Sequence, residues 1–538
     1  MSDRLPVFRL LRGKADLDRL ISIGRAAFEI TEFELADRVP WTTLRSGPHR
    51  VELCTLSGGL WAANEAELWN PELQPSLPDE AEAREIAHDF VRRYELLADV
   101  EPESPFKWQI DAGPGTVLAV QEGEEHRADR RLDTAVTYSA RVVVESGRES
   151  RELPVIGGGG KMTVTLGNEG RVIGYNGLWR EVADRGFLVE ILSREEVDRR
   201  FEDLVQGLEM ESYEARLAYY AAPSGIGQRF MYPVYVYTGM AVIDDSLMPL
   251  REVMLPATEF GPTWPELQPQ PPIRKPRTGL VATLAATVFP RSYVTWLLNP
   301  FEAGTSWIGV SGGLPGAKNN AKGFVDELAD DGWTINFNWG DANAWESDWR
   351  RNDDTWVDAA DFVFYTGHAD PHGWTLSSPD DGKLHSNEVG AQPQTPGDLW
   401  GQQDLEWLII AACGPLQDDV ITKNGGDVLA RWDGAFDGLH LLMGYGAATM
   451  DNELEGRRIV EYARDGATLS NAWFRTAREI QPSSNNYQAP FGPDIWVGTM
   501  WVADTTKPSP INDHLWGHGS VAPDPHSPNL KACMWTRT

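Results

Sequence analysis

Two short apolar segments in the C-terminal half of the chain each end in a residue that can do chemistry. The segment DFVFYTGHADPHG, residues 361–373, delivers His368, and DLEWLIIAACGPLQ, residues 404–417, delivers Cys413. Each apolar run has the length and continuous hydrophobicity typical of a buried parallel strand. In open α/β sheets, reactive groups gather at the carboxyl ends of the strands. The pattern therefore predicts that His368 and Cys413 meet at one edge of a sheet.

The sequence around these segments alternates strand-like and helix-like stretches. This rhythm predicts a mainly parallel sheet with helices on both faces, a three-layer α/β/α domain over residues 279–500, with residues 501–538 as a tail packed on it. The predicted strands are 307–311, 333–339, 362–366, 405–411 and 439–443, and the predicted helices are 317–331, 453–464 and 469–480.

The first half of the chain predicts a different, α+β organisation. A proline-rich stretch at 261–278 reads as an extended linker, which separates an accessory domain at 79–260 from the C-terminal domain and leaves 1–78 as an N-terminal segment. Ser193 with Glu196 three residues later predicts a capped helix start. The other expected elements are a helix at 79–97, a strand at 134–145, a hairpin at 153–179 that turns at 167–170, and strands at 232–242 and 251–256.

Composition narrows the class of partner. Lys and Arg number 48 against 80 Asp and Glu, a net charge of −32, which argues against nucleic acid or an anionic membrane as the main partner. No apolar run approaches the ~20 residues of a membrane span, and the first residues lack a signal-peptide core. As the sequence stands we expect a soluble, cytoplasmic protein, although trimming of a secretory leader would leave the same sequence. The three cysteines form no CxxC pair, so neither a disulfide framework nor a cysteine zinc site is expected.

A cysteine that attacks a carbonyl needs a thiolate, a base and donors for the developing oxyanion. Cys413 supplies the thiol, and His368 supplies the base. The backbone N–H groups of Cys413 and of Ala369 are the expected oxyanion donors, and Gly367 is the further backbone residue expected at the oxyanion site. Together these residues predict acyl-transfer chemistry at the sheet edge.

The arrangement resembles the caspase-like cysteine peptidases, a group that includes caspases, legumain, gingipains, clostripain and separase. The matching residues are 365–368 (YTGH) and 410–414 (IAACG), in the same order, over a region of about 200 residues. The resemblance implies a His/Cys dyad, no cofactor, and cleavage of a peptide or protein substrate after a residue chosen by a side-chain pocket. One departure is Ala369, which stands where the family has glycine and gives the backbone less freedom.

Two further expectations concern selectivity and control. Asp418 and Asp419 follow the cysteine and could select a basic side chain, although chance explains them equally well in so acidic a chain. The N-terminal half resembles PepSY-like propeptide domains at 162–177 and at the helix start near Ser193, which implies an inhibitory or chaperone role. Basic residues of the linker, Arg274, Lys275 and Arg277, form a possible processing site.

Three alternatives remain open. His368, Asp370 and His372 form an H-x-D-x-H cluster that, with His385, suits a transition metal, although the main hypothesis requires none. Ala369 favours a caspase-like module that binds without turnover. The same dyad could also serve a ligase or cyclase. We expect a cysteine endopeptidase without metal or cofactor, restrained or processed through its N-terminal half.

Overall fold

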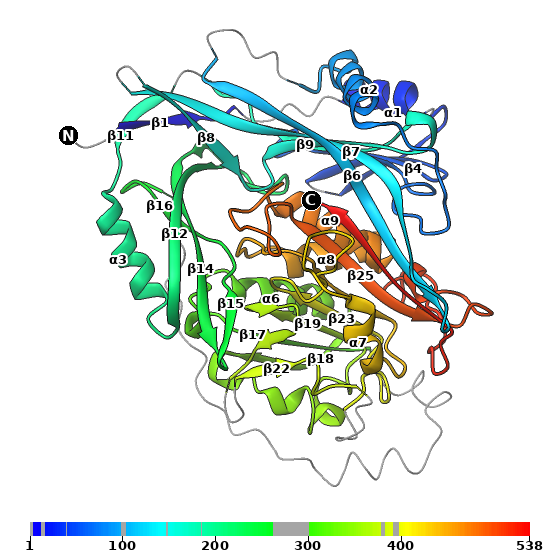
Figure 1. Ribbon diagram of the computed structural model, residues 1–538. Coiled ribbons are helices and arrows are strands. Elements are labelled where there is room, and N and C mark those ends of the chain that lie inside the picture. Colours follow the sequence, from blue (N-terminus) through cyan, green and yellow to red (C-terminus); the bar gives the residue numbers. More distant parts are fainter. Residues whose placement is uncertain are drawn as a thin grey trace.

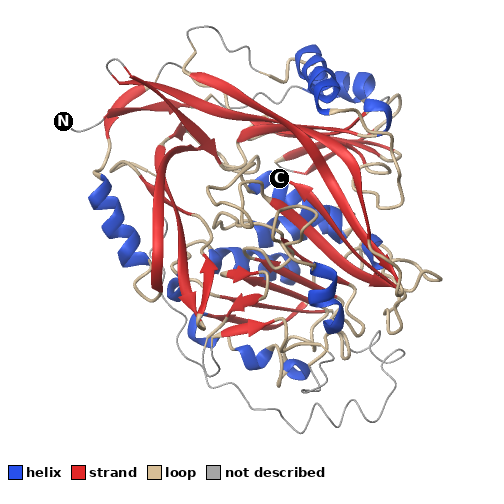
Figure 2. Cartoon of the chain, viewed as in Figure 1, coloured by secondary structure: helices blue, strands red, loops and turns tan. Residues whose placement is uncertain are grey.

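The computed structural model describes residues 4–11, 17–28, 30–38, 40–97, 104–146, 149–183, 186–261, 301–377, 382–390 and 398–538. The predicted linker lies outside this part of the chain from residue 262 onward, as do Arg274, Lys275 and Arg277. The protein is a mixed α/β structure built on a large mixed sheet, and strands dominate it (Figure 1, Figure 2).

Five parallel strands form the part of the sheet that carries the predicted site. Their spatial order is second, first, third, fourth and fifth, so the order reverses between the first and third strands, where open α/β sheets place their binding crevices. The strands are, from one edge inward, β18 (Thr334–Gly340), β17 (Glu302–Trp307), β19 (Phe362–Thr366), β23 (Trp407–Ala411) and β24 (Leu441–Tyr445).

The first of these strands was predicted at 307–311, and that prediction was wrong. The strand β17 ends at Trp307, and Val310–Gly312 forms a 3-10 turn, η2. The apolar pattern does not identify β17, because this strand contains small and hydroxyl residues instead of a continuous apolar run. Packing explains their size, since a Cβ on Gly304 would lie 2.0 Å from the Phe337 ring of β18.

The sheet continues without a break from the C-terminal half into the N-terminal half. After β24 it runs antiparallel through β25 (Trp496–Ala503) and β26 (Leu530–Arg537), and β26 then pairs with β6 (Phe106–Glu122) over seven residues. Residues 501–538, expected as a tail, thus contribute the end of β25 and all of β26. The long β6 and β7 (Ala128–Ser146) cross the molecule, and β26 lies between β6 and β25 (Figure 1).

Two cores lie on the two faces of the parallel strands. On one face pack three long helices, and on the other a tryptophan-rich core lies beneath short elements. The predicted helices are confirmed, whereas the expectation of comparable helices on both faces is not. The helices of the first face are α6 (Ala317–Asp330), α8 (Glu455–Arg464) and α9 (Leu469–Ile480). The second face carries α7 (Val428–Trp432), β20 (Ala369–Asp370), β21 (Gly373–Thr375), β22 (Lys383–His385), and the 3-10 turns η3 (Asp341–Asn343), η4 (Glu346–Asp348), η5 (Asp353–Thr355) and η6 (Asp433–Ala435).

The N-terminal half confirms most of the local predictions. Asp79 caps α2 (Glu80–Arg93) by accepting bonds from Ala81 and Glu82, and the Ser193 hydroxyl caps α3 (Arg194–Leu204). The hairpin of β9 (Gly160–Leu166) and β10 (Val172–Trp179) turns at η1 (Asn168–Gly170) as predicted. The remaining elements are β1 (Arg4–Arg9), α1 (Leu17–Ala27), β2 (Glu34–Arg38), β3 (Trp41–Ser46), β4 (His49–Cys54), β5 (Leu60–Asn64), β8 (Glu149–Ile156), β9 (Gly160–Leu166), β10 (Val172–Trp179), β11 (Phe187–Glu190), β12 (Glu209–Tyr220), β13 (Phe230–Met231), β14 (Pro233–Ile243), β15 (Ser246–Pro249), β16 (Val253–Pro256) and η7 (Pro510–Asn512).

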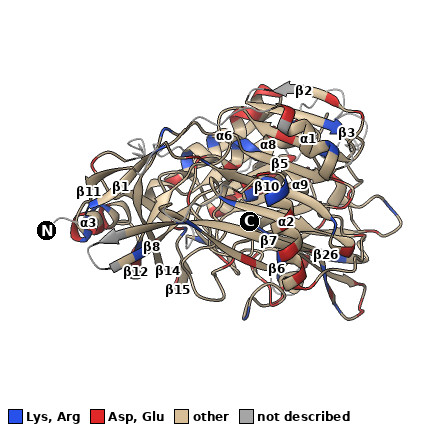
Figure 3. Cartoon of the chain, turned by 90° about the horizontal axis from the view of Figure 1, so that it is seen from above, with Lys and Arg blue, Asp and Glu red and all other residues tan. Residues whose placement is uncertain are grey.

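The strands β12, β14, β15 and β16 bring the N-terminal half to the edge where β19 and β23 end. They form an antiparallel group with α3 packed against it, and one core joins this group to Leu314 and Ala317 at the start of α6. Acidic and basic positions are interspersed along many elements (Figure 3). Among the described residues, no helix combines the length and apolar character that crossing a bilayer requires.

Candidate functional site

The two predicted reactive residues lie at the same edge of the sheet. Thr366, the last residue of β19, is in register with Ala411, the last residue of β23. His368 and Cys413 each follow two residues later, so both chains leave the sheet at the same level. The reversal of strand order between β17 and β19 lies beside them. The register therefore places the imidazole and the thiol at matched positions beyond neighbouring strands.

Cys413 stands on a tight turn and is sealed from solvent. The next residue, Gly414, has φ of 79°, a left-handed conformation that suits glycine, and its N–H donates to the Ala447 carbonyl. The Sγ atom accepts a hydrogen bond from the N–H of Thr449 at 3.4 Å and lies 3.9 Å from the Thr449 hydroxyl. Burial raises the pKa of the thiol to about 11. At neutral pH the residue is a neutral thiol.

His368 is also buried, and both of its ring nitrogens are engaged. Nδ1 accepts a hydrogen bond from the backbone N–H of Arg251 at 3.2 Å, which leaves Nε2 to donate to the Gly312 carbonyl at 2.7 Å. Burial lowers the pKa of the imidazole to about 4, and the nearby Arg251 charge acts in the same direction. The ring is neutral, and the nitrogen that could accept a proton is occupied.

The residues on either side of His368 fix its position. A Cβ on Gly367 would lie 2.1 Å from the Tyr365 hydroxyl, so the chain passes where only glycine fits. That hydroxyl donates to the Thr375 carbonyl at 2.5 Å and ties the turn to β21. Ala369 begins β20 and pairs with Trp374. The predicted oxyanion donor, the N–H of Ala369, therefore belongs to a buried hairpin.

Arg251, a residue that sequence reasoning missed as part of the site, occupies the space beside the two strand ends. Its side chain is fully buried. One guanidinium nitrogen, Nη1, donates to the Thr366 hydroxyl at 3.0 Å and to the Ala411 carbonyl at 2.7 Å. The other, Nη2, donates to the Met450 carbonyl at 2.8 Å and pairs with Glu455 at 3.1 Å. A side chain from the N-terminal half thus bridges β19 and β23.

Three neighbouring side chains hold the carboxylate of Glu455 in place beside the Arg251 guanidinium. Its Oε1 accepts hydrogen bonds from the Tyr445 hydroxyl at 2.6 Å and the Gln481 amide at 2.7 Å, while Oε2 also accepts one from Asn320 at 3.1 Å. Burial lowers the pKa of Arg251, but Glu455, Asp451 and the smaller contributions of Cys413 and Tyr445 together outweigh burial and raise the pKa above its ordinary value. The pair is well organised. Its two members lie 204 residues apart, and no local pattern links them.

The predicted selectivity residues lie elsewhere and have other partners. Asp418 is buried and bonded to Arg127, and it also accepts from the backbone N–H groups of Val420 and Val428. Asp419 is exposed and accepts a bond from Gly426. The carboxylate of Asp418 therefore has a structural role, whereas Glu455 pairs with Arg251 beside the strand ends.

The H-x-D-x-H residues do not converge on one point. Asp370 pairs with Lys383 at 2.6 Å, and His385 pairs with Asp244 at 2.7 Å. His368 is engaged as described above, and burial lowers the pKa of His372. Groups of three ligand atoms within 4.8 Å of one another do occur in the described part of the chain, but they are acidic: Asp353, Asp354 and Asp358, and Asp361, Asp404 and Glu406.

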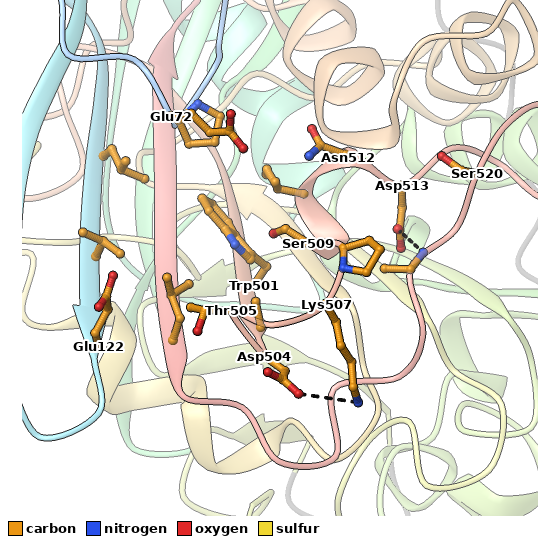
Figure 4. A pocket seen from close by; sticks show the side chains of 18 of the residues that line it. Glu72, Glu122, Trp501, Asp504, Thr505, Lys507, Ser509, Asn512, Asp513 and Ser520 are labelled. Atoms are coloured by element: carbon orange, nitrogen blue, oxygen red, sulfur yellow. Dashed lines mark hydrogen bonds and ion pairs between the residues drawn. The ribbon is translucent and has the colours of Figure 1, made fainter.

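A separate pocket of about 640 Å³ opens at the opposite edge of the sheet (Figure 4). Trp501, which lines it, pairs with Leu441 at the start of β24, whereas the site lies near the ends of β19 and β23. Its rim carries an ion pair between Asp504 and Lys507, and Asp513 accepts from the N–H of Ala522. No histidine or cysteine is among the described residues that line this pocket, so it lacks the thiol and imidazole found at the strand ends.

Buried carboxyl groups give the protein an expected pH dependence. Burial raises the pKa of Asp353 and Asp361 to about 8 and that of Asp358 to about 7. The folded state then holds protons that the unfolded chain loses near pH 4, so these groups stabilise fully below that pH and progressively less up to pH 8. We expect the free energy of unfolding to fall by about 6 kcal/mol from pH 6 to 8, at ~1.36 kcal/mol per pKa unit for each group, as measured by urea denaturation. Asp361→Asn should flatten the dependence, and stability that rises over this interval would contradict it.

Comparison with known proteins places a family domain on the C-terminal part of the chain. A family model described as a domain of unknown function, DUF6345, matches residues 301–538. No curated protein matches the chain. A solved structure of an uncharacterized protein from Eubacterium rectale is 10% identical, with 48% of this chain and 85% of that one covered and a TM-score of 0.28, a likeness too low to carry an argument. The matched domain contains His368, Cys413 and Glu455, whereas Arg251 lies outside it.

Proposed function

We propose that this chain is a cysteine endopeptidase of the caspase-like type, held in a closed state. The observation that carries the proposal is the register of β19 and β23, which sets His368 and Cys413 equally far beyond the paired residues Thr366 and Ala411. An imidazole and a thiol at neighbouring strand ends are the two groups that acyl transfer requires. The order of the parallel strands, which reverses beside them, supports a crevice at this place.

The reaction would use the two residues in turn. Cys413 passes its proton to His368 and attacks the peptide carbonyl carbon, and the oxyanion is met by backbone N–H groups at the strand ends. His368 returns the proton to the leaving amine as the C–N bond breaks. Water then hydrolyses the thioester, which frees the acid and restores the thiol. Because burial raises the pKa of Cys413 and lowers that of His368, the site must open before proton transfer becomes favourable.

A covalent probe and a cleavage assay test this function together. Prolonged incubation with peptidyl acyloxymethyl ketones should label Cys413, and a peptide library should be cut slowly. Both activities should fall by about three orders of magnitude or more in Cys413→Ala and His368→Ala. Cys533→Ala is the matched control, because Cys533 is equally buried but lies in β26. Label on Cys413 that does not depend on His368 would contradict the proposal.

A second candidate is a binding module that keeps this fold without turnover. The burial of Cys413 and the occupied nitrogens of His368 favour it. Such a protein would show no cleavage under any opening condition, whereas a ligase would give joined products by mass spectrometry.

A further inference from the structure

Residues 250–252 lie across the candidate site and form one isolated β-bridge there. The N–H of Glu252 donates to the Thr449 carbonyl at 2.7 Å, and the N–H of Asp451 donates to the Glu252 carbonyl at 2.9 Å, which makes a parallel bridge between Glu252 and Met450. Thr449 also donates to the sulfur of Cys413. The segment is therefore bound by main-chain bonds to the loop that touches the thiol, in the manner in which sheet edges bind extended peptides.

The neighbouring residues hold the segment from outside. The Tyr487 hydroxyl donates to the Leu250 carbonyl at 2.8 Å, and the Glu252 carboxylate accepts from the N–H of Asn486 at 2.8 Å. Arg216 lies 3.6 Å from the same carboxylate. These contacts fix the residues on both sides of Arg251, whose own side chain enters the space between the strand ends.

The pocket around Arg251 has the chemistry of a site for a guanidinium group. It offers the Glu455 carboxylate, the carbonyls of Ala411 and Met450, and the Thr366 hydroxyl. Arginine is the side chain whose planar fork suits such convergent acceptors. Two of these acceptors stand only two residues before the imidazole and the thiol, which is where a side chain must be held if the adjoining peptide bond is to react.

A purely structural role explains this burial poorly. An apolar side chain of similar size generally stabilises a core as well as a buried ion pair does, because removing two charges from water is costly. The fit is also incomplete, since Arg251 Nε and Asp451 Oδ1 are both buried without a hydrogen-bond partner in the described structure. A side chain with a purely structural role would not require the backbone N–H of Arg251 to donate to Nδ1 of His368, the ring nitrogen that could accept a proton.

We propose that this pocket is the substrate side-chain pocket of the enzyme, that it takes an arginine of a peptide substrate, and that residues 250–252 fill it as a built-in blocking segment. The inference rests on the proposed peptidase function. When the segment leaves, His368 Nδ1 regains a free lone pair, and the pocket becomes open to an arginine in trans.

The test uses the full-length chain with Arg251→Met, and Arg251→Lys as a milder second variant that keeps the charge. Two probes of nearly equal shape are compared, a peptidyl arginyl acyloxymethyl ketone and its citrulline counterpart, which lacks the charge. We expect the arginyl probe to label Cys413 of Arg251→Met about tenfold or more faster than the citrulline probe does. The arginyl probe should label wild-type Cys413 more slowly than Cys413 of either variant. Agmatine, an arginine side-chain mimic, should raise the Tm of Arg251→Met but not that of wild type.

Arg180→Met is the matched control. Arg180 is also a buried arginine of the N-terminal half, and its partners among the described residues are the carbonyls of Ala222, Pro223 and Ile226. We expect Arg180→Met to be labelled at Cys413 at the wild-type rate. Equal labelling by the two probes, or wild-type labelling as fast as that of folded Arg251→Met or Arg251→Lys, would overturn the inference. Stabilisation by agmatine without labelling or cleavage would instead leave the arginine pocket standing and overturn the peptidase function.

Discussion

Glu455→Gln is expected to destabilise the protein by about 3–5 kcal/mol and to loosen residues 250–252. The substitution preserves shape, and the new side-chain carbonyl can still accept from Tyr445 and Gln481. It removes the carboxylate that pairs with the fully buried Arg251. Urea denaturation measures the loss, and hydrogen exchange reports whether the segment opens before the rest of the chain.

Two free-energy costs decide whether Glu455→Gln opens residues 250–252 locally or unfolds the whole chain. Leaving a guanidinium buried and unpaired costs about 3–5 kcal/mol. Detaching the segment breaks main-chain hydrogen bonds at Leu250, Arg251 and Glu252 worth about 1 kcal/mol each. Because the two costs are similar, local opening competes with global unfolding, and exchange protection at 250–252 should fall further than protection in β19. The double variant Arg251→Met with Glu455→Gln should recover much of the lost stability. A coupling energy near zero in that cycle would refute the pairing.

Local sequence signals accounted for most elements of the site. The strand β19 has the predicted bounds because its apolar run is continuous and is stopped by Gly367, and α9 likewise matches its helical spacing. The bounds of β17 were not predicted correctly. The ring of Phe337 leaves room only for a small residue at position 304, so the strand lacks the continuous apolar pattern that identifies a buried strand. Hydrophobic periodicity cannot identify a strand whose residues are small because a neighbouring side chain packs against them.

The parts of the site that could not be predicted all depend on contacts between distant segments. Arg251 and His368 lie 117 residues apart, and the first reads as an ordinary charged residue at the start of a strand. Asp418 was a reasonable choice for a basic side chain by its nearness to Cys413, but Arg127 from the N-terminal half already pairs with it. In both cases the deciding partner comes from the other half of the chain, where no local pattern can point to it.

The same dependence predicts that residues 301–538, the stretch matched by the family model, will not fold into a stable monomer alone. Removing the first half exposes the edge of β26 that pairs with β6, and an open apolar strand edge promotes aggregation. It also uncovers the core shared across the halves, where Trp69 packs edge-on against Phe474 at 5.4 Å. Exposing this apolar surface to water costs on the order of 10 kcal/mol, comparable with the ~5–15 kcal/mol that stabilises a typical protein.

We therefore expect the fragment to aggregate or to lack a cooperative melting transition by circular dichroism. Co-expression of residues 1–261 with residues 301–538 is the matched control, since it removes only chain that lies outside the described residues. The two pieces should purify as one complex and melt together, because the β6–β26 pairing and the buried Arg475–Glu52 ion pair both join them. A monomeric 301–538 fragment with a Tm near that of the whole chain would show that the C-terminal domain is independent, and residues 250–252 would then be dispensable for folding and free to act only on the site.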